Sequence, residues 1–361
     1  MTAIGKSVQE LDTPALLLDL GACDRNLRRM ADFFRDRPCK PRPHFKNHKC
    51  VTLARRQAAA GEAVGMTCAK LGEAEVLADA GFDNVLIANQ VLGEGKMHRL
   101  AAVAERIKIA VAVDDASQVQ ALSRAAQERG VTIGALVEVD VGMGRCGVQP
   151  GEPVLSLAQQ IVDSRGVRFD GLQAYEGHTV YIADFQERDA KTRKSMQLAL
   201  DSKALLEARG IVVPTVSGGA SATYNITGAM PGWGEIQCGT YATMDWKYAT
   251  MVPEFEIAMT VLVTVISRPA PGVAVIDLGV KGAGGEFGLP RIKDCPQIEV
   301  PYFIAEEHTV LKNAPDWKVG QTVELISSHA CTTCNLHRWF YVHDAGRVVD
   351  VWPIEASGKL T

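Results

Sequence analysis

The chain has 361 residues, of which 47% are hydrophobic and 22% charged, and its formal net charge is −4 at pH 7. This balance is typical of a soluble globular protein and provides no basic field that would attract nucleic acid or an anionic membrane. The first residues lack the apolar core of a signal peptide, and no apolar run approaches the roughly 20 residues of a membrane span. We therefore expect a cytoplasmic protein that binds small molecules or a second copy of itself, and whose nine cysteines are reduced thiols.

Short runs rich in β-branched residues alternate with longer amphipathic runs between residues 41 and 241. The eight predicted strands are 41–46, 63–68, 84–89, 107–113, 134–140, 169–177, 214–219 and 235–241. Amphipathic runs such as 69–81 and 115–130 lie between them and end in glycine, as helices often do. Eight such units predict an α/β protein with a (β/α)₈ barrel of the TIM type over residues 22–250.

After residue 250 the pattern changes to strands without intervening helices, at 256–268, 272–279, 321–327 and 338–352. In the last of these runs, residues 344–347 have the composition of a hairpin turn. An early strand-like run, 14–20, precedes the barrel pattern and is predicted to pair with these strands. We therefore expect a second, antiparallel β domain formed by residues 1–21 and 251–361.

Lys46 ends the first predicted strand, within the decapeptide PRPHFKNHKC of residues 41–50. The chemistry of such barrels lies at the carboxyl ends of the strands. A partly desolvated lysine beside other cations has its ammonium form disfavoured, which gives an amine able to form a Schiff base with an aldehyde. The alternative is a solvated basic surface. A metal site at His44 and His48 is disfavoured, because Pro43 argues against the helix that would place both on one face.

The glycines of residues 142–147 follow the fifth predicted strand in a G-x-G-x-x-G pattern. A dinucleotide-binding turn is disfavoured, because the pattern does not open a βαβ unit and a proline and a glycine separate it from the next helix. Arg145 in this loop offers a fixed cation at the barrel mouth. An ion pair with Glu138 or Asp140 is the structural alternative.

The seventh predicted strand ends in VSGGASATYN, where glycines and hydroxyl groups precede a helix N-terminus. This combination suits an anion, and phosphate sites in such barrels often follow strands seven and eight. The predicted phosphate-binding residues are Ser217, Gly218, Gly219, Thr223, Gly239, Thr240 and Tyr241. Ordinary turn glycines and a helix N-cap are the alternative. A reactive lysine together with a phosphate cup suggests pyridoxal 5'-phosphate as cofactor.

The segment SSHACTTCNLH, residues 327–337, holds two histidines and two cysteines. A closed structural zinc site normally shows two paired clusters, and a redox C-x-x-C needs a βα context that is missing here. His329 and Cys331 have the i, i+2 spacing that places both side chains on one face of an extended segment. Two protein ligands leave positions open for water and substrate, as a catalytic metal needs. Buried core cysteines are the alternative.

Together these motifs resemble the metal-activated branch of fold-type III pyridoxal-phosphate enzymes, the D-threonine aldolase and D-serine dehydratase family. The resemblance covers nearly the whole chain and runs through LDTPALLLDL, RPHFKNHK, VEVDVGMGRCGV, GLQAYEGH, VSGGASATY, QCGTYATMD, AEEH, SSHACTT and VDVWPIEASGK. It implies an alanine-racemase-like barrel followed by a β domain, in a homodimer. By matching positions it implies that Lys46 is the Schiff-base lysine and that Arg145 faces the pyridine nitrogen. Tyr175 with Gln173 would form a wall of the cofactor site.

The resemblance also implies a substrate, a D-configured β-hydroxy-α-amino acid whose hydroxyl group binds a divalent metal held by His329 and Cys331. If the hydroxyl loses its proton, the Cα–Cβ bond breaks to give glycine and an aldehyde. If the hydroxyl group instead leaves as hydroxide, the products are a keto acid and ammonia. Motifs such as GLQAYEG, YATMD and VWPIEASGK are similar to the aldolases, and retro-aldol cleavage is our prediction.

Two departures from the aldolase pattern keep β-elimination as the alternative. The aldolases carry His-x-Asp, whereas Cys331 gives the His-x-Cys of the dehydratases, and its thiolate favours zinc over manganese or magnesium. Glu176 stands where the aldolases tend to have histidine or glutamine, so we expect His178 to take a proton-transfer role. A metal-independent racemase would share the barrel and Lys46 but would need no metal pair. A non-catalytic cofactor-binding protein would lack the C-terminal domain, and simple metal binding would not depend on Lys46.

Overall fold

The structure is a computed structural model that describes residues 3–361, so the first two residues of the predicted β domain lie outside the described part. It divides into two compact units, which we call the barrel unit and the β unit. The barrel unit comprises residues 30–46, 54–239 and 359–361. The β unit comprises the residues up to Arg29, 47–53 and 240–358.

All eight predicted barrel strands form, and they are parallel neighbours in one sheet. They are β2 (Lys40–Pro41), β3 (Met66–Cys68), β4 (Asn84–Ile87), β5 (Lys108–Val113), β6 (Ile133–Val139), β7 (Val167–Ala174), β8 (Val216–Gly218) and β9 (Glu235–Ile236). The sheet order is β2-β9-β8-β7-β6-β5-β4-β3. The backbone N–H of Thr67 donates to the carbonyl of Pro43 at 2.8 Å, and this bond joins the two ends of the sheet into a barrel. Several strands differ in length from the prediction: β2, β7 and β9 end earlier, and β3 and β8 begin later.

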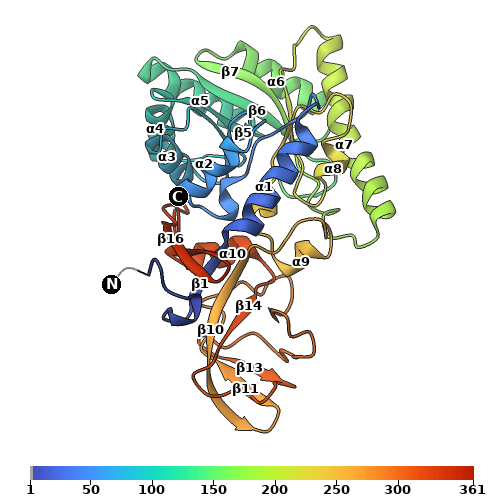
Figure 1. Ribbon diagram of the computed structural model, residues 1–361. Coiled ribbons are helices and arrows are strands. Elements are labelled where there is room, and N and C mark those ends of the chain that lie inside the picture. Colours follow the sequence, from blue (N-terminus) through green and yellow to red (C-terminus); the bar gives the residue numbers. More distant parts are fainter. Residues whose placement is uncertain (1–2) are drawn as a thin grey trace. The chain divides into compact units, whose positions relative to one another are not determined.

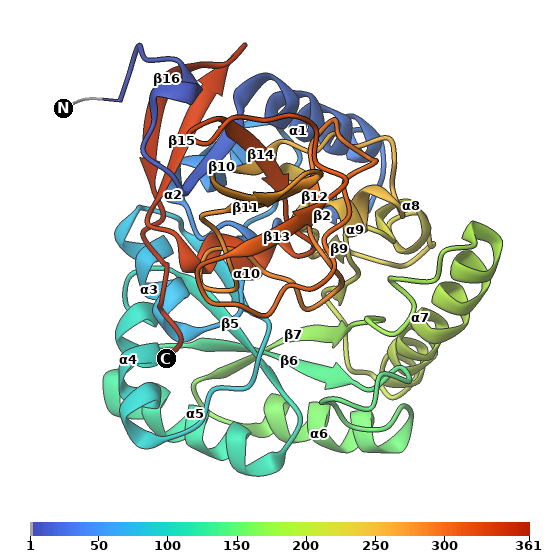
Figure 2. The same cartoon turned by 90° about the horizontal axis from the view of Figure 1, so that it is seen from below.

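Helices follow the strands as the (β/α)₈ pattern requires, and Figure 2 shows them outside the strands. They are α1 (Leu20–Phe34), α2 (Val51–Ala59), α3 (Leu71–Asp79), α4 (Glu94–Ala104), α5 (Ala116–Arg129), α6 (Glu152–Asp163), α7 (Phe185–Ala208) and α8 (Tyr224–Thr227). Helix α5 begins at an Asp115 cap and ends at Gly130, whose φ of 66° is left-handed. All seven residues of β6 are buried, as expected for a parallel strand covered by helices.

The β unit contains one mixed sheet (Figure 1). Its strands are β1 (Ala15–Asp19), β10 (Met259–Ala270), β11 (Val273–Ile276), β12 (Arg291–Ile292), β13 (Thr309–Lys312), β14 (Thr322–Ile326), β15 (Trp339–Asp344) and β16 (Arg347–Pro353). Two short helices, α9 (Trp246–Ala249) and α10 (Ala330–Leu336), belong to the same unit. As predicted, the early run joins this sheet as β1, and a hairpin joins β15 to β16. The domain is not wholly antiparallel, however, because β1 pairs with β15 in parallel. A hairpin would force two strands to run antiparallel. No hairpin connects β1 with β15, so the connection between them also allows parallel pairing.

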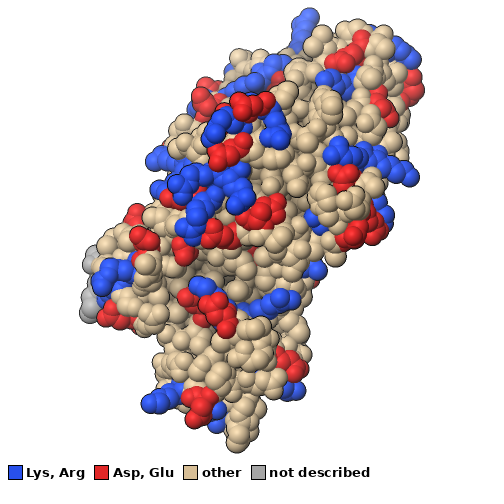
Figure 3. Space-filling model, turned by 45° about the vertical axis from the view of Figure 1, so that its right-hand side comes forward, with Lys and Arg blue, Asp and Glu red and all other residues tan. Residues whose placement is uncertain are grey.

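On the face shown in Figure 3, lysine and arginine side chains lie next to acidic ones. Within residues 3–361, no helix combines the length and apolarity that crossing a membrane requires.

The ion pair between Arg42 and Glu235 links the chain just after β2 to the neighbouring strand β9. Nε and Nη2 of Arg42 each donate to a carboxylate oxygen of Glu235 at 2.8 Å, and both side chains are largely buried. We predict that Glu235→Ala lowers the free energy of unfolding by about 3 kcal/mol, because it leaves a buried guanidinium without its counter-ion. Glu105→Ala, which removes the exposed pair with Arg129, should cost less than about 1 kcal/mol. Urea titration measures both, and equal losses would contradict the prediction.

Candidate active site

Lys46 lies at the carboxyl end of the first barrel strand, in a 3-10 turn over Phe45–Asn47. Its side chain is half-buried, and its Nζ lies 5.9 Å from the ring centroid of Tyr175, just beyond the end of β7. Arg42 is buried and paired, and Lys49 is buried, so this segment is not a solvated basic surface.

Arg145 lies over the same ring, with its Cζ 5.2 Å from the Tyr175 centroid. Its guanidinium pairs with Oε1 of Glu138 at 3.4 Å, while Nε2 of Gln90 donates to Oε2 at 2.6 Å. Burial raises the pKa of Glu138, against the opposing effects of Gln90 and Arg145. Arg145 therefore meets both predictions at once. It forms the ion pair with Glu138, and it lies over Tyr175 at the barrel mouth.

The glycine loop of residues 142–147 is not a strand-to-helix phosphate turn. Oδ1 of Asp140 accepts the backbone N–H groups of Gly142 and Gly144, both at 3.0 Å, so those donors already have a carboxylate. The chain then returns to the sheet, because Val148 bridges to Val139 before α6 begins. The loop serves to present Arg145.

The turn after β8 brings together three of the predicted phosphate-binding residues, Gly218, Gly219 and Thr223. Gly219 has a φ of +78°, a backbone conformation that favours glycine, and a Cβ there would lie 2.7 Å from Cδ1 of Ile236. The backbone N–H of Ala220 donates to Oγ1 of Thr223 at 3.0 Å. Nearby, Nε2 of Gln237 joins two further predicted residues, Gln173 and Ser217, by donating to their oxygens at 3.1 and 3.0 Å.

Glu176 lies behind this turn and is wholly buried. Its Oε1 accepts from the hydroxyls of Thr223 at 2.6 Å and Thr227 at 2.9 Å, and the backbone N–H of Gly219 also faces the carboxyl group. Burial raises the pKa of Glu176 in spite of these donors. The sequence identified Glu176 as a departure from the aldolase pattern. It did not indicate which residues donate hydrogen bonds to Glu176.

His178 is exposed on the loop after β7, and its Nε2 lies 3.1 Å from Oγ of Ser195 on α7. Its role in proton transfer stays a prediction. Gly239 is the last residue of its segment of the barrel unit, and Thr240 with Tyr241 opens a buried 3-10 turn in the β unit. The ring of Tyr241 packs edge-to-face against Phe255 at 6.1 Å.

His329 and Cys331 come together in the β unit, although the expectation of an extended segment is wrong. His329 is the N-cap of α10, and Cys331 lies in the first turn of this helix. Burial alone would lower the pKa of His329, but Cys331 and Glu286 outweigh it and raise the pKa to about 9. The imidazole therefore lies beside both Cys331 and Glu286.

Two residues without any signal in the sequence belong to the same cluster. Glu286 accepts from Nδ1 of His329 and from the hydroxyl of Thr332, and this carboxylate orients the imidazole. Asn47, which follows Lys46 in the chain, has Nδ2 3.5 Å from Sγ of Cys331.

The second cysteine of the C-x-x-C pair plays a different part. Cys334 is buried with its Sγ 3.4 Å from Sδ of Met259, and burial raises its pKa far above the usual range of a thiol. Cys334 is therefore a neutral core residue. Nowhere in residues 3–361 do three or more His, Cys, Asp or Glu side chains gather in a way that would hold a metal ion.

The side chains fit the two groups that the sequence suggests. Lys46 supplies an amine, Arg145 a fixed cation and Tyr175 an aromatic face, which are the groups that a pyridoxal ring needs. His329, with Nδ1 engaged by Glu286, and Cys331 offer the imidazole and thiolate donors of a zinc-type site.

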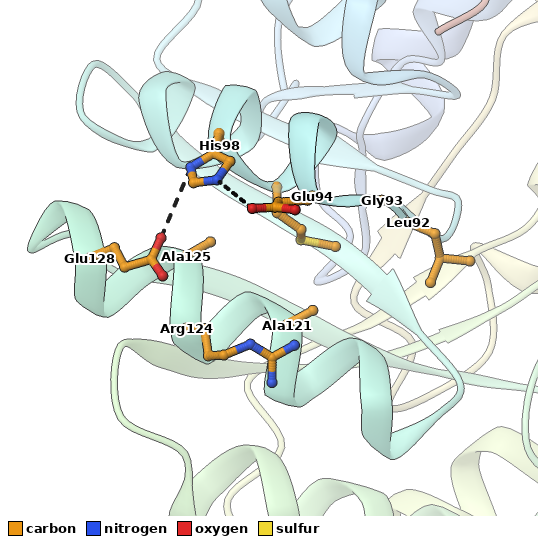
Figure 4. A pocket seen from close by; sticks show the side chains of 9 residues that line it. Leu92, Gly93, Glu94, His98, Ala121, Arg124, Ala125 and Glu128 are labelled. Carbon is orange, nitrogen blue, oxygen red and sulfur yellow. Dashed lines mark ion pairs between the residues drawn. The ribbon is translucent and has the colours of Figure 1, made fainter.

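A pocket of about 400 Å³ lies elsewhere in the barrel unit, between α4 and α5 (Figure 4). His98 lies there 3.8 Å from Glu94 and 4.0 Å from Glu128, and all three side chains are at least half exposed. None of the predicted site residues lines this pocket.

Comparison with known proteins agrees with this architecture. Residues 18–245 match the family model of the alanine racemase N-terminal domain, and residues 258–343 match that of a serine dehydratase domain. This chain belongs to the alanine racemase N-terminal domain family. It is a lyase of a pyridoxal-phosphate-dependent fold family.

Within the family, aldolases are among the most similar proteins. The chain is 38% identical to the D-threonine aldolase of Arthrobacter sp over 98% of its own length and 95% of the relative's. It is 35% identical to the 3-hydroxy-D-aspartate aldolase of Paracoccus denitrificans over 98% and 94%. The crystal structure of D-threonine aldolase from Filomicrobium marinum superposes with a TM-score of 0.96 at 39% identity, covering 99% of this chain and 98% of that one.

The burial of Glu176 predicts a pH dependence of stability. Its pKa in the folded protein lies above the ordinary 4.5, so its stabilising contribution is complete below that pH and is lost as the pH rises through the folded value. Glutamine keeps the acceptor oxygen and does not titrate. The melting temperature of Glu176→Gln relative to the wild type should therefore increase as the pH rises above 4.5. Because all other groups cancel in this difference, a gap that is constant or shrinks with pH would refute the assignment.

Proposed function

We propose that this protein is a pyridoxal-phosphate- and divalent-metal-dependent lyase that cleaves D-configured β-hydroxy-α-amino acids to glycine and an aldehyde. The observation that carries the proposal is the convergence of Lys46 and Arg145 on the ring of Tyr175 at the carboxyl end of the barrel strands. The similarity to the D-threonine and 3-hydroxy-D-aspartate aldolases supports retro-aldol cleavage and a substrate of that class.

The bound cofactor would take up the electrons released at Cα, and a divalent metal would lower the pKa of the β-hydroxyl group. Lys46 supplies the amine that holds the cofactor aldehyde. Arg145, fixed by Glu138, keeps a positive charge at the ring, and Tyr175 forms one wall with Gln173. His178 moves a proton during the reaction. The segments that would form the phosphate site contain Ser217, Gly218, Gly219, Thr223, Gly239, Thr240 and Tyr241.

His329 and Cys331 hold the metal in this proposal, and the thiolate favours zinc over manganese or magnesium. Glu286 orients His329 through Nδ1 and leaves Nε2 for the metal. A relative supports such a site. The D-threo-3-hydroxyaspartate dehydratase of Delftia sp. is 26% identical over 90% of this chain, and a cysteine-to-alanine variant of such a dehydratase is known in a metal-free form.

The second candidate function is β-elimination, and Cys331 is the observation that favours it. A dehydratase of the D-serine or 3-hydroxyaspartate type would use the same groups but release a keto acid and ammonia. A racemase is the weaker alternative, because it gives no reason for the paired His329 and Cys331. The resemblance to the family supports a homodimer.

A product assay tests the proposal. With D-threonine and 3-hydroxy-D-aspartate we expect glycine and an aldehyde, a loss of activity after chelation, and its return with added zinc or manganese. D-serine is the matched substrate for the second candidate, and Lys46→Ala should be inactive on all three. Keto acid and ammonia as main products would replace the aldolase by the dehydratase. Activity that chelation leaves intact would favour the racemase and overturn the metal site.

The identity of the metal ligand can be tested by exchange. Cys331→Asp replaces a soft thiolate by a hard carboxylate, so the affinity for zinc should fall by about tenfold while that for manganese is kept or rises. Calorimetry on metal-free protein measures both. Cys334→Ala, three residues on in the same helix, should leave both affinities unchanged. Equal effects of the two substitutions on zinc binding would exclude Cys331 as a specific ligand.

A further inference from the structure

Glu176 has a fully buried carboxyl group. The proposed reaction assigns no role to this group. Burying such a group costs free energy unless hydrogen bonds replace its water. The described partners of its side chain lie in the turn after β8 and in α8, which are the segments proposed to hold the cofactor phosphate.

The hydrogen bonds of Thr223 connect Glu176 to the backbone of the turn. The hydroxyl of Thr223 donates to Oε1 of Glu176 at 2.6 Å and accepts the backbone N–H of Ala220 at 3.0 Å. A hydroxyl has one proton, so donation to Glu176 turns its lone pairs toward Ala220. Without that acceptor, the hydroxyl proton can turn to the carbonyl of Ala220 at 3.4 Å.

Two further contacts extend this support. Thr227 in α8 donates to the same Oε1 at 2.9 Å, and the N–H of Gly219 faces the carboxyl group. The carboxyl group therefore joins the first residue after β8, the cap of α8 and the body of that helix.

Resting on the proposed function, we propose that Glu176 is a positioning residue that holds the turn of residues 218–223 in its phosphate-binding shape, acting through Thr223 and Thr227. Thr223 then contributes to phosphate binding through the shape of the turn, since its hydroxyl proton is directed at Glu176. Glu176 itself touches neither the cofactor ring nor the substrate.

The charge of Glu176 is compatible with this role. A carboxylate behind the turn would repel a phosphate dianion, but burial raises the pKa of Glu176 and so favours the neutral acid. The neutral acid accepts at Oε1 and keeps its proton on Oε2, which is buried. In this form it is electrically equivalent to glutamine, so Gln is the conservative replacement.

The test compares pyridoxal phosphate with pyridoxal, which has the same ring and aldehyde but no phosphate. Dissociation constants for both are measured on cofactor-free protein from the visible absorption band. In Glu176→Ala we expect the affinity for pyridoxal phosphate to fall by about tenfold, because hydrogen bonds that shape the turn are lost, while pyridoxal binding is unchanged. Glu176→Gln should stay within about threefold of the wild type for both ligands.

Control variants separate this role from general damage. Glu73 is equally buried in the barrel unit but caps α3 through the N–H groups of Ala69 and Lys70. Glu73→Ala should therefore keep the wild-type ratio of the two affinities even if it lowers stability. If Glu176→Ala does not fold, Thr227→Val removes one of the same bonds without changing the shape of the side chain. It should weaken only pyridoxal phosphate binding, by about threefold.

Several outcomes would overturn the inference. One is an equal loss of affinity for both ligands. Another is an unchanged affinity for pyridoxal phosphate in Glu176→Ala or, if that variant does not fold, in Thr227→Val. The third is a Glu176→Gln variant that binds pyridoxal phosphate as weakly as Glu176→Ala does. A wild-type protein that binds pyridoxal as tightly as pyridoxal phosphate, or binds neither, would instead refute the proposed function itself.

Discussion

A carboxyl group supports each part of the proposed site: Glu138 and Glu176 are buried, so the cost of their burial determines what their neighbours must be, while Glu286 remains partly exposed. Glu138 carries the guanidinium of Arg145, Glu176 accepts from the hydroxyls behind the β8 turn, and Glu286 engages the imidazole of His329. The pairings of Glu138 and Glu176 satisfy carboxyl groups that would otherwise be buried without a partner. The groups proposed to touch cofactor, metal and substrate are thereby held in place before any of these binds.

The arrangement of the barrel could be read from the sequence because its signals are local. Alternation of β-branched and amphipathic runs indicated all eight strands, and glycine at 130 marked the end of α5. The early strand and the hairpin at 344–347 followed from equally local patterns. The parallel pairing of β1 with β15 had no such signal, because it joins segments about 320 residues apart.

Only part of the candidate site could be predicted, because many of its contacts join residues far apart in the sequence. Lys46 and Arg145 were accessible to prediction because strand ends of a barrel carry the chemistry, and Tyr175 through resemblance to the family. The supporting residues Glu286 and Gln90 lie 43 and 48 residues from their partners, with nothing in the sequence to join them. Spacing also misled at Cys331, since i, i+2 was taken for an extended segment where a helix begins. The pair still meets, because an N-cap and the first turn lie close together.

The central claim is that Lys46 holds the aldehyde of pyridoxal phosphate. Reduction of the cofactor-loaded protein with borohydride would make that bond permanent, and peptide mass spectrometry would then locate it. We expect one pyridoxyl-phosphate adduct per chain, on Lys46. An adduct on another lysine, or none after loading, would exclude Lys46 as the residue that holds the aldehyde.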